Sequence, residues 1–189
     1  MSELNQTAKK QLLEIAEASV QSGVSTGRPI NIVLSEYDAE LSRERASFVT
    51  LHLAGQLRGC IGSLQAYRPL AQDVADNAFA AAFRDPRFPP VSAGEAAKLH
   101  FHISVLSETS PMSFVDEQDL LSQIRPQIDG LVLEDGFNRG TFLPSVWEQL
   151  PDKRDFLNQL KRKAGLPTDY WSDKLAISRY TVEDIEATS

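Results

Sequence analysis

The chain has only one cysteine, Cys60, among its 189 residues, and this scarcity excludes several classes of protein. A single thiol cannot form an internal disulfide, and it cannot supply the three or four thiolates that a typical iron–sulfur centre uses. No apolar run approaches the roughly 20 residues that a transmembrane helix needs. The N-terminal stretch also lacks the contiguous hydrophobic block of a secretory signal peptide. Together these absences predict a cytoplasmic protein without a membrane span.

Positive charge is also scarce. The chain carries 19 lysines and arginines against 26 aspartates and glutamates, which gives a formal net charge of −7. A nucleic-acid surface needs clustered positive charge to displace counterions from phosphate, so this balance argues against such a partner. One basic run lies within residues 153–163. Because its last three cations fall in the final turn of a predicted helix, where they complement the helix dipole, we interpret the run as a solvated helix face. These cations are Lys161, Arg162 and Lys163.

Length and hydrophobic pattern predict the fold class. Hydrophobic residues make up 42% and charged residues 24% of the chain, as in ordered soluble proteins. Strand pairs joined by short turns, interrupted by helices without a regular alternation, predict an α+β fold with antiparallel sheet. The predicted helices cover residues 6–22 with a stop at Gly23, 69–83, 116–124, 145–150 and 152–164. Ser92 with Glu95 is a candidate capping box for one short turn of helix. The predicted strands form hairpins at 48–62 and 129–144, an alternating strand at 99–106 and a last strand at 175–182.

The stretch LRGCIG at residues 57–62 is the first candidate for chemistry. In an extended strand Arg58 and Cys60 point to one face, while Leu57 and Ile61 point to the other and anchor the segment in the core. A cation beside a thiol favours the nucleophilic thiolate, and flanking glycines let a ligand or another backbone approach closely. The alternative is that Cys60 is a small buried hydrophobe and that the glycines belong to a β-bulge.

Two further groups of polar residues are weaker candidates. His100 and His102 share one face of a predicted strand and could ligate zinc with Cys60 as a third ligand, but we favour the simpler interpretation of a polar, half-exposed strand face. Asp85 and Arg87 flank a proline after a helix, and they either form a structural clamp or line a cleft. The chain has no phosphate loop, dinucleotide fingerprint, zinc-finger spacing or H-E-x-x-H motif.

Six segments, taken in order and spacing, resemble the AMMECR1-type family, which is also called AmmeMemoRadiSam system protein A. The resemblance runs from about Phe48 to the last strand, and LRGCIG is its most specific motif. The other segments are DPRFPP (85–90), SVLS (104–107), DGLVLEDG (129–136), RGTFLPSVWEQ (139–149) and FLNQLKRKAGL (156–166).

The resemblance implies a single domain over residues 1–189, built from two subdomains that each carry an antiparallel sheet flanked by helices. It also implies a cleft between the subdomains, with the 57–62 motif at their junction. Such a cleft is a common place for a ligand. The catalytic candidates are then Cys60 and Arg58. The substrate-binding candidates are Gly59, Gly62, Ser63, Asp85, Arg87 and Pro144.

The resemblance leaves the biochemical role open between two classes. One is an enzyme, or a component of a modification pathway, that uses Cys60 and Arg58 on a sizeable substrate. The other is a non-catalytic binding or adaptor module that grips a protein or peptide. The family name implies two pathway partners, a Memo-type protein and a radical S-adenosylmethionine enzyme. Nothing in the residues indicates an iron–sulfur cluster or an S-adenosylmethionine site in this chain itself, and its cofactor is left open.

Overall fold

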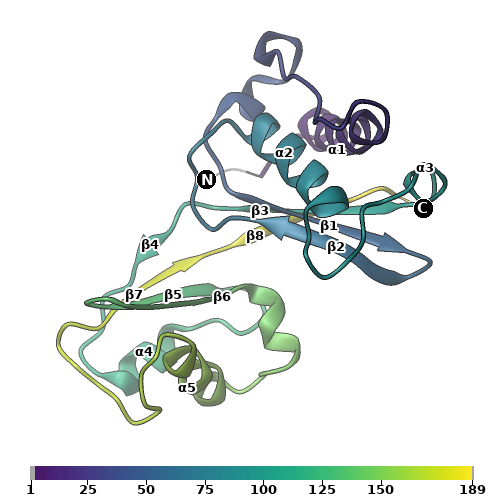
Figure 1. Ribbon diagram of the computed structural model, residues 1–189. Helices are drawn as coiled ribbons and strands as arrows, with labels where there is room; N and C mark the ends of the chain where they lie inside the picture. Colours follow the sequence, from purple (N-terminus) through teal and green to yellow (C-terminus); the bar gives the residue numbers. More distant parts are fainter. Residues whose placement is uncertain (1–2, 189) are drawn as a thin grey trace. The chain divides into compact units, whose positions relative to one another are not determined.

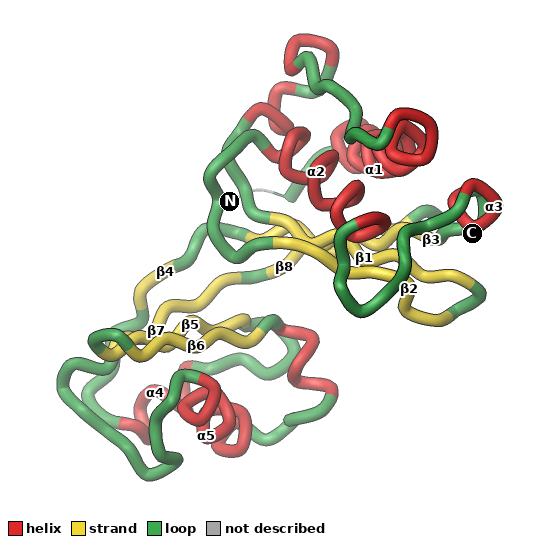
Figure 2. The backbone as a smooth tube through the Cα atoms, in the orientation of Figure 1, coloured by secondary structure: helices red, strands yellow, loops and turns green. Residues whose placement is uncertain are grey.

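Helices and two four-stranded sheets make up the fold in the computed structural model, which describes residues 3–188 (Figures 1 and 2). The predicted α+β class with antiparallel sheets is therefore confirmed. The chain divides into two compact units, residues 1–106 with 183–189, and residues 107–182. No helix in the part of the chain that the structure describes has both the length and the apolar character of a membrane span.

The sheet of the first unit has the strand order β2-β1-β3-β8. The first two strands form the predicted hairpin, whose turn consists of Ala54 and Gly55 with φ angles of 50° and 77°. Positive φ at both turn residues matches the right-handed twist of the flanking strands. The strands are β1 (Ser47–Leu53), β2 (Gln56–Gly62), β3 (His100–Leu106) and β8 (Val182–Glu186).

Helices cover one face of this sheet, as Figure 1 shows for α1 and α2. Alternate side chains of β1, including Val49 and Leu51, are fully buried beneath them. The residues that alternate with them, Phe48, Thr50 and His52, are half-buried on the opposite face. The helical segments are α1 (Gln6–Thr26), α2 (Leu70–Phe83), α3 (Ala93–Ala96) and the 3₁₀ turns Leu34–Glu36 and Ala39–Ser42.

The predicted end of the first helix at Gly23 is wrong. Helix α1 continues to Thr26 and ends at Gly27, whose φ of 72° is left-handed. Gly23 serves a different purpose, because a Cβ atom there would lie only 2.1 Å from the ring of Phe83. The glycine is thus a site of close packing between α1 and α2 rather than a helix terminator.

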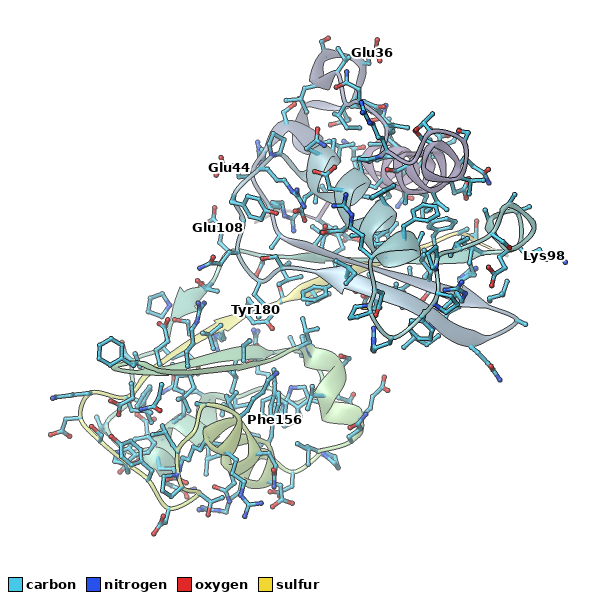
Figure 3. All side chains as sticks on the ribbon, viewed as in Figure 1. Glu36, Glu44, Lys98, Glu108, Phe156 and Tyr180 are labelled. Atoms are coloured by element: carbon cyan, nitrogen blue, oxygen red, sulfur yellow. The ribbon has the colours of Figure 1, made fainter. Side chains whose placement is uncertain are left out.

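The sheet of the second unit has the strand order β4-β7-β5-β6. Its core includes Trp147, whose ring stacks on that of Phe156 with the ring centroids 3.7 Å apart and an angle of 6° between the ring planes. Phe156 is labelled in Figure 3. The elements of this unit are β4 (Ser110–Pro111), α4 (Glu117–Gln123), β5 (Gly130–Asp135), β6 (Asn138–Phe142), the 3₁₀ helix Pro144–Glu148, α5 (Lys153–Lys163) and β7 (Ala176–Tyr180).

The prediction of one last strand at 175–182 is also wrong, because two strands of different sheets occupy this region. Strand β7 ends at Tyr180 and β8 begins at Val182. The residue between them, Thr181, bonds to Ser107: its carbonyl accepts from the Ser107 N–H at 2.9 Å, and its own N–H donates to the Ser107 hydroxyl at 2.9 Å. These local bonds mark the change of sheet.

The basic run on α5 is only partly solvated, contrary to our interpretation. Lys161 is completely buried, and its Nζ donates to Glu117 at 3.2 Å and to the Thr168 carbonyl at 3.1 Å. The same ammonium lies 5.7 Å from the ring centroid of Trp171. Arg162 and Lys163 are exposed as expected.

Candidate functional site

A β-bulge shapes the LRGCIG segment. Leu51 pairs with Gly59 and His52 pairs with Leu57, so Arg58 is the extra residue on β2. A bulge interrupts the alternation of side chains between the two faces. As a result Leu57 is 41% exposed, and the prediction that it anchors the strand in the core is wrong. Ile61, beyond the bulge, does pack against the core as expected.

Arg58 is buried and paired with a glutamate. It is 8% exposed, and its Nε and Nη2 donate to the two carboxylate oxygens of Glu95 at 3.0 and 3.2 Å. These hydrogen bonds lower the pKa of Glu95 to about 2. The remaining nitrogen, Nη1, is buried without a hydrogen-bond partner among residues 3–188. The charge of Arg58 is therefore directed at Glu95 on α3.

Glu95 also belongs to the capping box of α3, as the sequence predicted. Its carboxylate accepts the Ser92 N–H at 2.8 Å, while the Ser92 hydroxyl accepts the Glu95 N–H at 3.3 Å. A capping box satisfies two backbone donors at a helix start. Here the same carboxylate ties that helix start to the bulge on β2.

Cys60 is half-buried, and its Sγ accepts a hydrogen bond from the Thr50 hydroxyl at 3.2 Å. Thr50 lies on the central strand β1, opposite Cys60 on one side and His102 on the other. The three residues thus form one row across β2, β1 and β3. This row lies on the sheet face away from the buried positions of β1.

Asp85 and Arg87 cover the free edge of β2. Asp85 Oδ2 accepts the Cys60 N–H at 3.0 Å, and the Arg87 guanidinium reaches the Cys60 carbonyl at 3.5 Å. The two side chains pair with each other at 2.7 Å, and this bond holds the pKa of the Asp85 carboxyl well below its usual range. Two side chains thus replace the missing neighbouring strand and protect an edge that would otherwise be open to pairing. The contacts are those of the structural clamp, one of our two interpretations.

The glycines of the motif allow close approach of the chain to itself. A Cβ atom on Gly59 would lie 2.1 Å from the Ala81 carbonyl oxygen on α2. A Cβ atom on Gly62 would lie 2.4 Å from the Ser47 carbonyl oxygen. The space that both glycines leave is therefore occupied by neighbouring backbone.

Ser63 and Pro144 have local structural contacts. The Ser63 N–H bonds to the Ser47 carbonyl at 3.2 Å, and its hydroxyl accepts the Gln65 N–H at 3.1 Å. Pro144 begins a 3₁₀ helix in the second unit. The structure thus assembles Arg58, Cys60, Asp85 and Arg87 around β2, while Pro144 belongs to the other unit.

Two residues that sequence reasoning did not connect with the motif complete this cluster. One is Phe88: the Arg58 guanidinium lies 5.9 Å from the centroid of its ring, and the Arg87 guanidinium lies 5.4 Å from it. Glu95 was expected only as a helix cap. No sequence signal links either residue to β2, because the link depends on how the 85–96 segment folds back over the strand.

His100 and His102 face carboxylates of β8. His102 Nε2 lies 2.8 Å from Asp184 and its Nδ1 lies 2.5 Å from Glu186, while His100 lies 3.6 Å from Glu186. The bond to Asp184 raises the pKa of His102. Within residues 3–188 no group of three or more histidine, cysteine or acidic side chains has the arrangement of a metal site. The pair thus forms an ionic link between β3 and β8.

The sequence and fold together identify the family. The sequence model of the AMMECR1 family matches residues 13–185, and the chain belongs to this family. A protein of Thermotoga maritima is 42% identical over 147 residues, which cover 76% of this chain and 79% of that one. A protein of Methanothermobacter thermautotrophicus is 35% identical over 172 residues, covering 90% and 88%.

The fold also has a counterpart among solved structures. The crystal structure of the uncharacterized protein PH0010 from Pyrococcus horikoshii superposes with a TM-score of 0.80 at 30% sequence identity. The match covers 96% of this chain and 91% of that one.

Proposed function

We propose that the protein is a binding module that docks a protein partner on the surface of β2 and the 85–90 loop. The observation that carries this proposal is the attachment of the loop to the strand edge through Asp85 and Arg87. A segment held in one conformation before binding loses little conformational entropy when a partner arrives. We call this surface the β2–loop surface; it consists of residues 57–60 and 85–90.

The exposed chemistry of the β2–loop surface suits a protein interface. Arg87 has a 55% exposed side chain, and Phe88 beside it is half-buried. Aromatic residues and arginine are enriched at the centre of protein interfaces and supply much of their binding energy. Three prolines, at positions 86, 89 and 90, are exposed in the same loop and restrict its backbone.

The charges around Cys60 favour binding over nucleophilic catalysis. A nucleophilic thiol is usually activated by a base within hydrogen-bond reach. Within residues 3–188 the hydrogen-bond partner of Sγ is the Thr50 hydroxyl, and the nearby cations Arg58 and Arg87 are paired with Glu95 and Asp85. This arrangement supports a structural role for the motif beneath a docking surface.

The test compares Phe88→Ala with Phe137→Ala, which makes the same change at a fully exposed ring on the tip of the β5–β6 hairpin. The probes are the two partners that the family name implies, a purified Memo-type protein and a radical S-adenosylmethionine enzyme from the same organism. We expect Phe88→Ala to weaken binding by about tenfold or more, as for an interface hot spot. Phe137→Ala should keep the wild-type affinity, and far-UV circular dichroism checks that each variant folds. Equal affinity of Phe88→Ala and the wild type would refute the proposed surface.

A second candidate function is that of an enzyme component in which Cys60 reacts. Two observations favour it: the thiol is half-buried rather than sealed, and the Arg87 guanidinium contacts the Cys60 backbone carbonyl at 3.5 Å. The cation that would assist a thiolate is then Arg87 rather than Arg58. The rate of alkylation by iodoacetamide against pH tests this role. An inflection near the free thiol value of about 8.5, unchanged in Arg87→Gln, would argue against it.

A further inference from the structure

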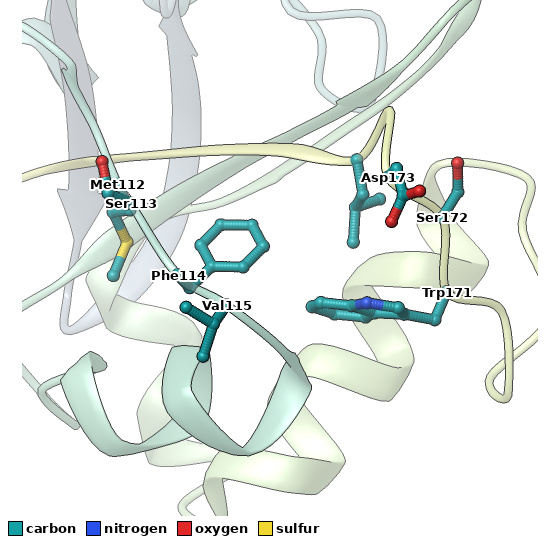
Figure 4. A pocket seen from close by; sticks show the side chains of 8 residues that line it. Met112, Ser113, Phe114, Val115, Trp171, Ser172 and Asp173 are labelled. Atoms are coloured by element: carbon teal, nitrogen blue, oxygen red, sulfur yellow. The ribbon is translucent and has the colours of Figure 1, made fainter.

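A pocket in the second unit lies where two paired strands separate. The hydrogen-bond ladder between β4 and β7 continues to a bond from the Met112 N–H to the Ile177 carbonyl at 2.8 Å. Beyond this bond the two segments of the backbone separate. The space between them measures about 330 Å³. Figure 4 shows the Phe114 ring and the Trp171 indole projecting into this space from two different segments of the backbone. The other lining residues that matter here are Met112, Val115, Asp173 and Leu175.

The lining of this pocket combines two aromatic rings with polar groups, which include Ser113, Ser172 and one charged side chain. Phe114 and Trp171 form a tilted pair with ring centroids 5.6 Å apart. Asp173 is the single charged residue of the lining. Its side chain is exposed, and it makes no salt bridge within the described part of the chain. An aromatic wall with one unpaired carboxylate is complementary to a ligand that has an apolar stem and a positive end.

The buried ammonium of Lys161 does not cancel this preference. It lies 5.7 Å from the centroid of the Trp171 ring, but it is paired with Glu117 at 3.2 Å. The charge beneath the indole is therefore balanced inside the unit. Asp173 remains as the unbalanced charge at the pocket itself.

We infer that this pocket binds an arginine side chain of a protein partner. The guanidinium ion-pairs with Asp173 and lies against the Trp171 and Phe114 rings, and the aliphatic stem contacts Val115 and Leu175. Arginine fits better than lysine because its planar, weakly hydrated head both stacks on aromatic rings and pairs with a carboxylate through two hydrogen bonds. The volume is near the lower end of the range of about 300–1,000 Å³ for ligand pockets, as suits one side chain. This site is independent of the β2–loop surface.

Tryptophan fluorescence gives a direct test. Trp147 is only 1% exposed, so a change in tryptophan emission on ligand binding reports on the half-buried Trp171. The probe is an acetylated, amidated glycine–arginine–glycine peptide, and the matched peptides carry citrulline, which has the same shape without charge, or lysine. We expect a saturable emission change with the arginine peptide at concentrations up to about 10 mM, and binding at least about fivefold weaker with citrulline.

Two variants with the same change in charge locate the site. Asp173→Asn should weaken binding of the arginine peptide by about fivefold or more, whereas Asp169→Asn, at an exposed position of the same loop that does not line the pocket, should leave it within about twofold. Far-UV circular dichroism confirms that both variants fold. The inference is overturned if no saturable change occurs, if citrulline or lysine binds as tightly as arginine, or if the two variants behave alike.

Discussion

Replacing Gly59 by alanine tests the packing beneath the LRGCIG motif. The added methyl would lie 2.1 Å from the Ala81 carbonyl oxygen, whereas ordinary van der Waals contacts begin at 3.4 Å. The obstacle is backbone of α2 rather than a flexible side chain, so the strand or the helix must move by about 1 Å. Both elements belong to the core of the first unit, where overpacking costs about 3 kcal/mol or more.

A matched control is available at Gly94, where a Cβ atom meets nothing within 4 Å and the φ angle is not left-handed. Gly94→Ala should leave stability unchanged or raise it by about 0.5 kcal/mol, since alanine restricts the unfolded chain. Urea unfolding followed by circular dichroism measures both variants, and thermal unfolding should show a decrease of about 6–12 °C for Gly59→Ala. If the stabilities of the two variants agree within about 0.5 kcal/mol, the close approach of α2 to β2 is not as described.

Three further predictions concern charged groups. Asp85→Ala should lower the free energy of unfolding by about 2–3 kcal/mol, because it removes a salt bridge and the acceptor of the Cys60 N–H; urea titration measures the change, and a loss below about 0.5 kcal/mol would contradict the clamp. The raised pKa of His102 means that its stabilising charge is fully present below about pH 6.5 and is lost as the pH rises through the folded value. The free energy of unfolding of the wild type should therefore fall by about 0.5–1 kcal/mol as the pH rises beyond this range, a modest figure because the partner carboxylates are exposed. His102→Gln should remove this pH dependence. An equal change of stability with pH in both proteins would refute the ionic link between β3 and β8. Lys161→Ala should cost about 3 kcal/mol in denaturant unfolding, whereas Arg162→Ala, at the next and exposed position, should cost less than about 0.5 kcal/mol.

Regular alternation made β3 predictable and β2 only partly so. In β3 every second residue is buried, so the faces of Phe101 and Ile103 follow from the sequence. In β2 a single extra residue, Arg58, breaks the period, and the face assigned to Leu57 is consequently wrong. A bulge depends on the pairing with β1 and on the bond to Glu95, neither of which a local pattern contains.

Contacts distant in sequence explain the other differences. Glycine is a residue type that often ends helices, but a Cβ atom at Gly23 would overlap the ring of Phe83. Lys161 has the sequence context of a solvated cation, but its ammonium donates a hydrogen bond inside the unit to Glu117, which is 44 residues away in the sequence. The order of motifs was enough to predict the family and the fold class, because both depend on spacing rather than on individual contacts.

The passage from β7 to β8 through Thr181 has a consequence for synthesis of the protein. Strand β8 pairs in the first sheet although all the other strands of that sheet lie before residue 107. During synthesis on the ribosome, the edge of β3 that pairs with β8 therefore stays unpaired while the roughly 75 residues between the two strands are made. A nascent chain that stops before residue 182 therefore leaves that edge open to pairing with another chain.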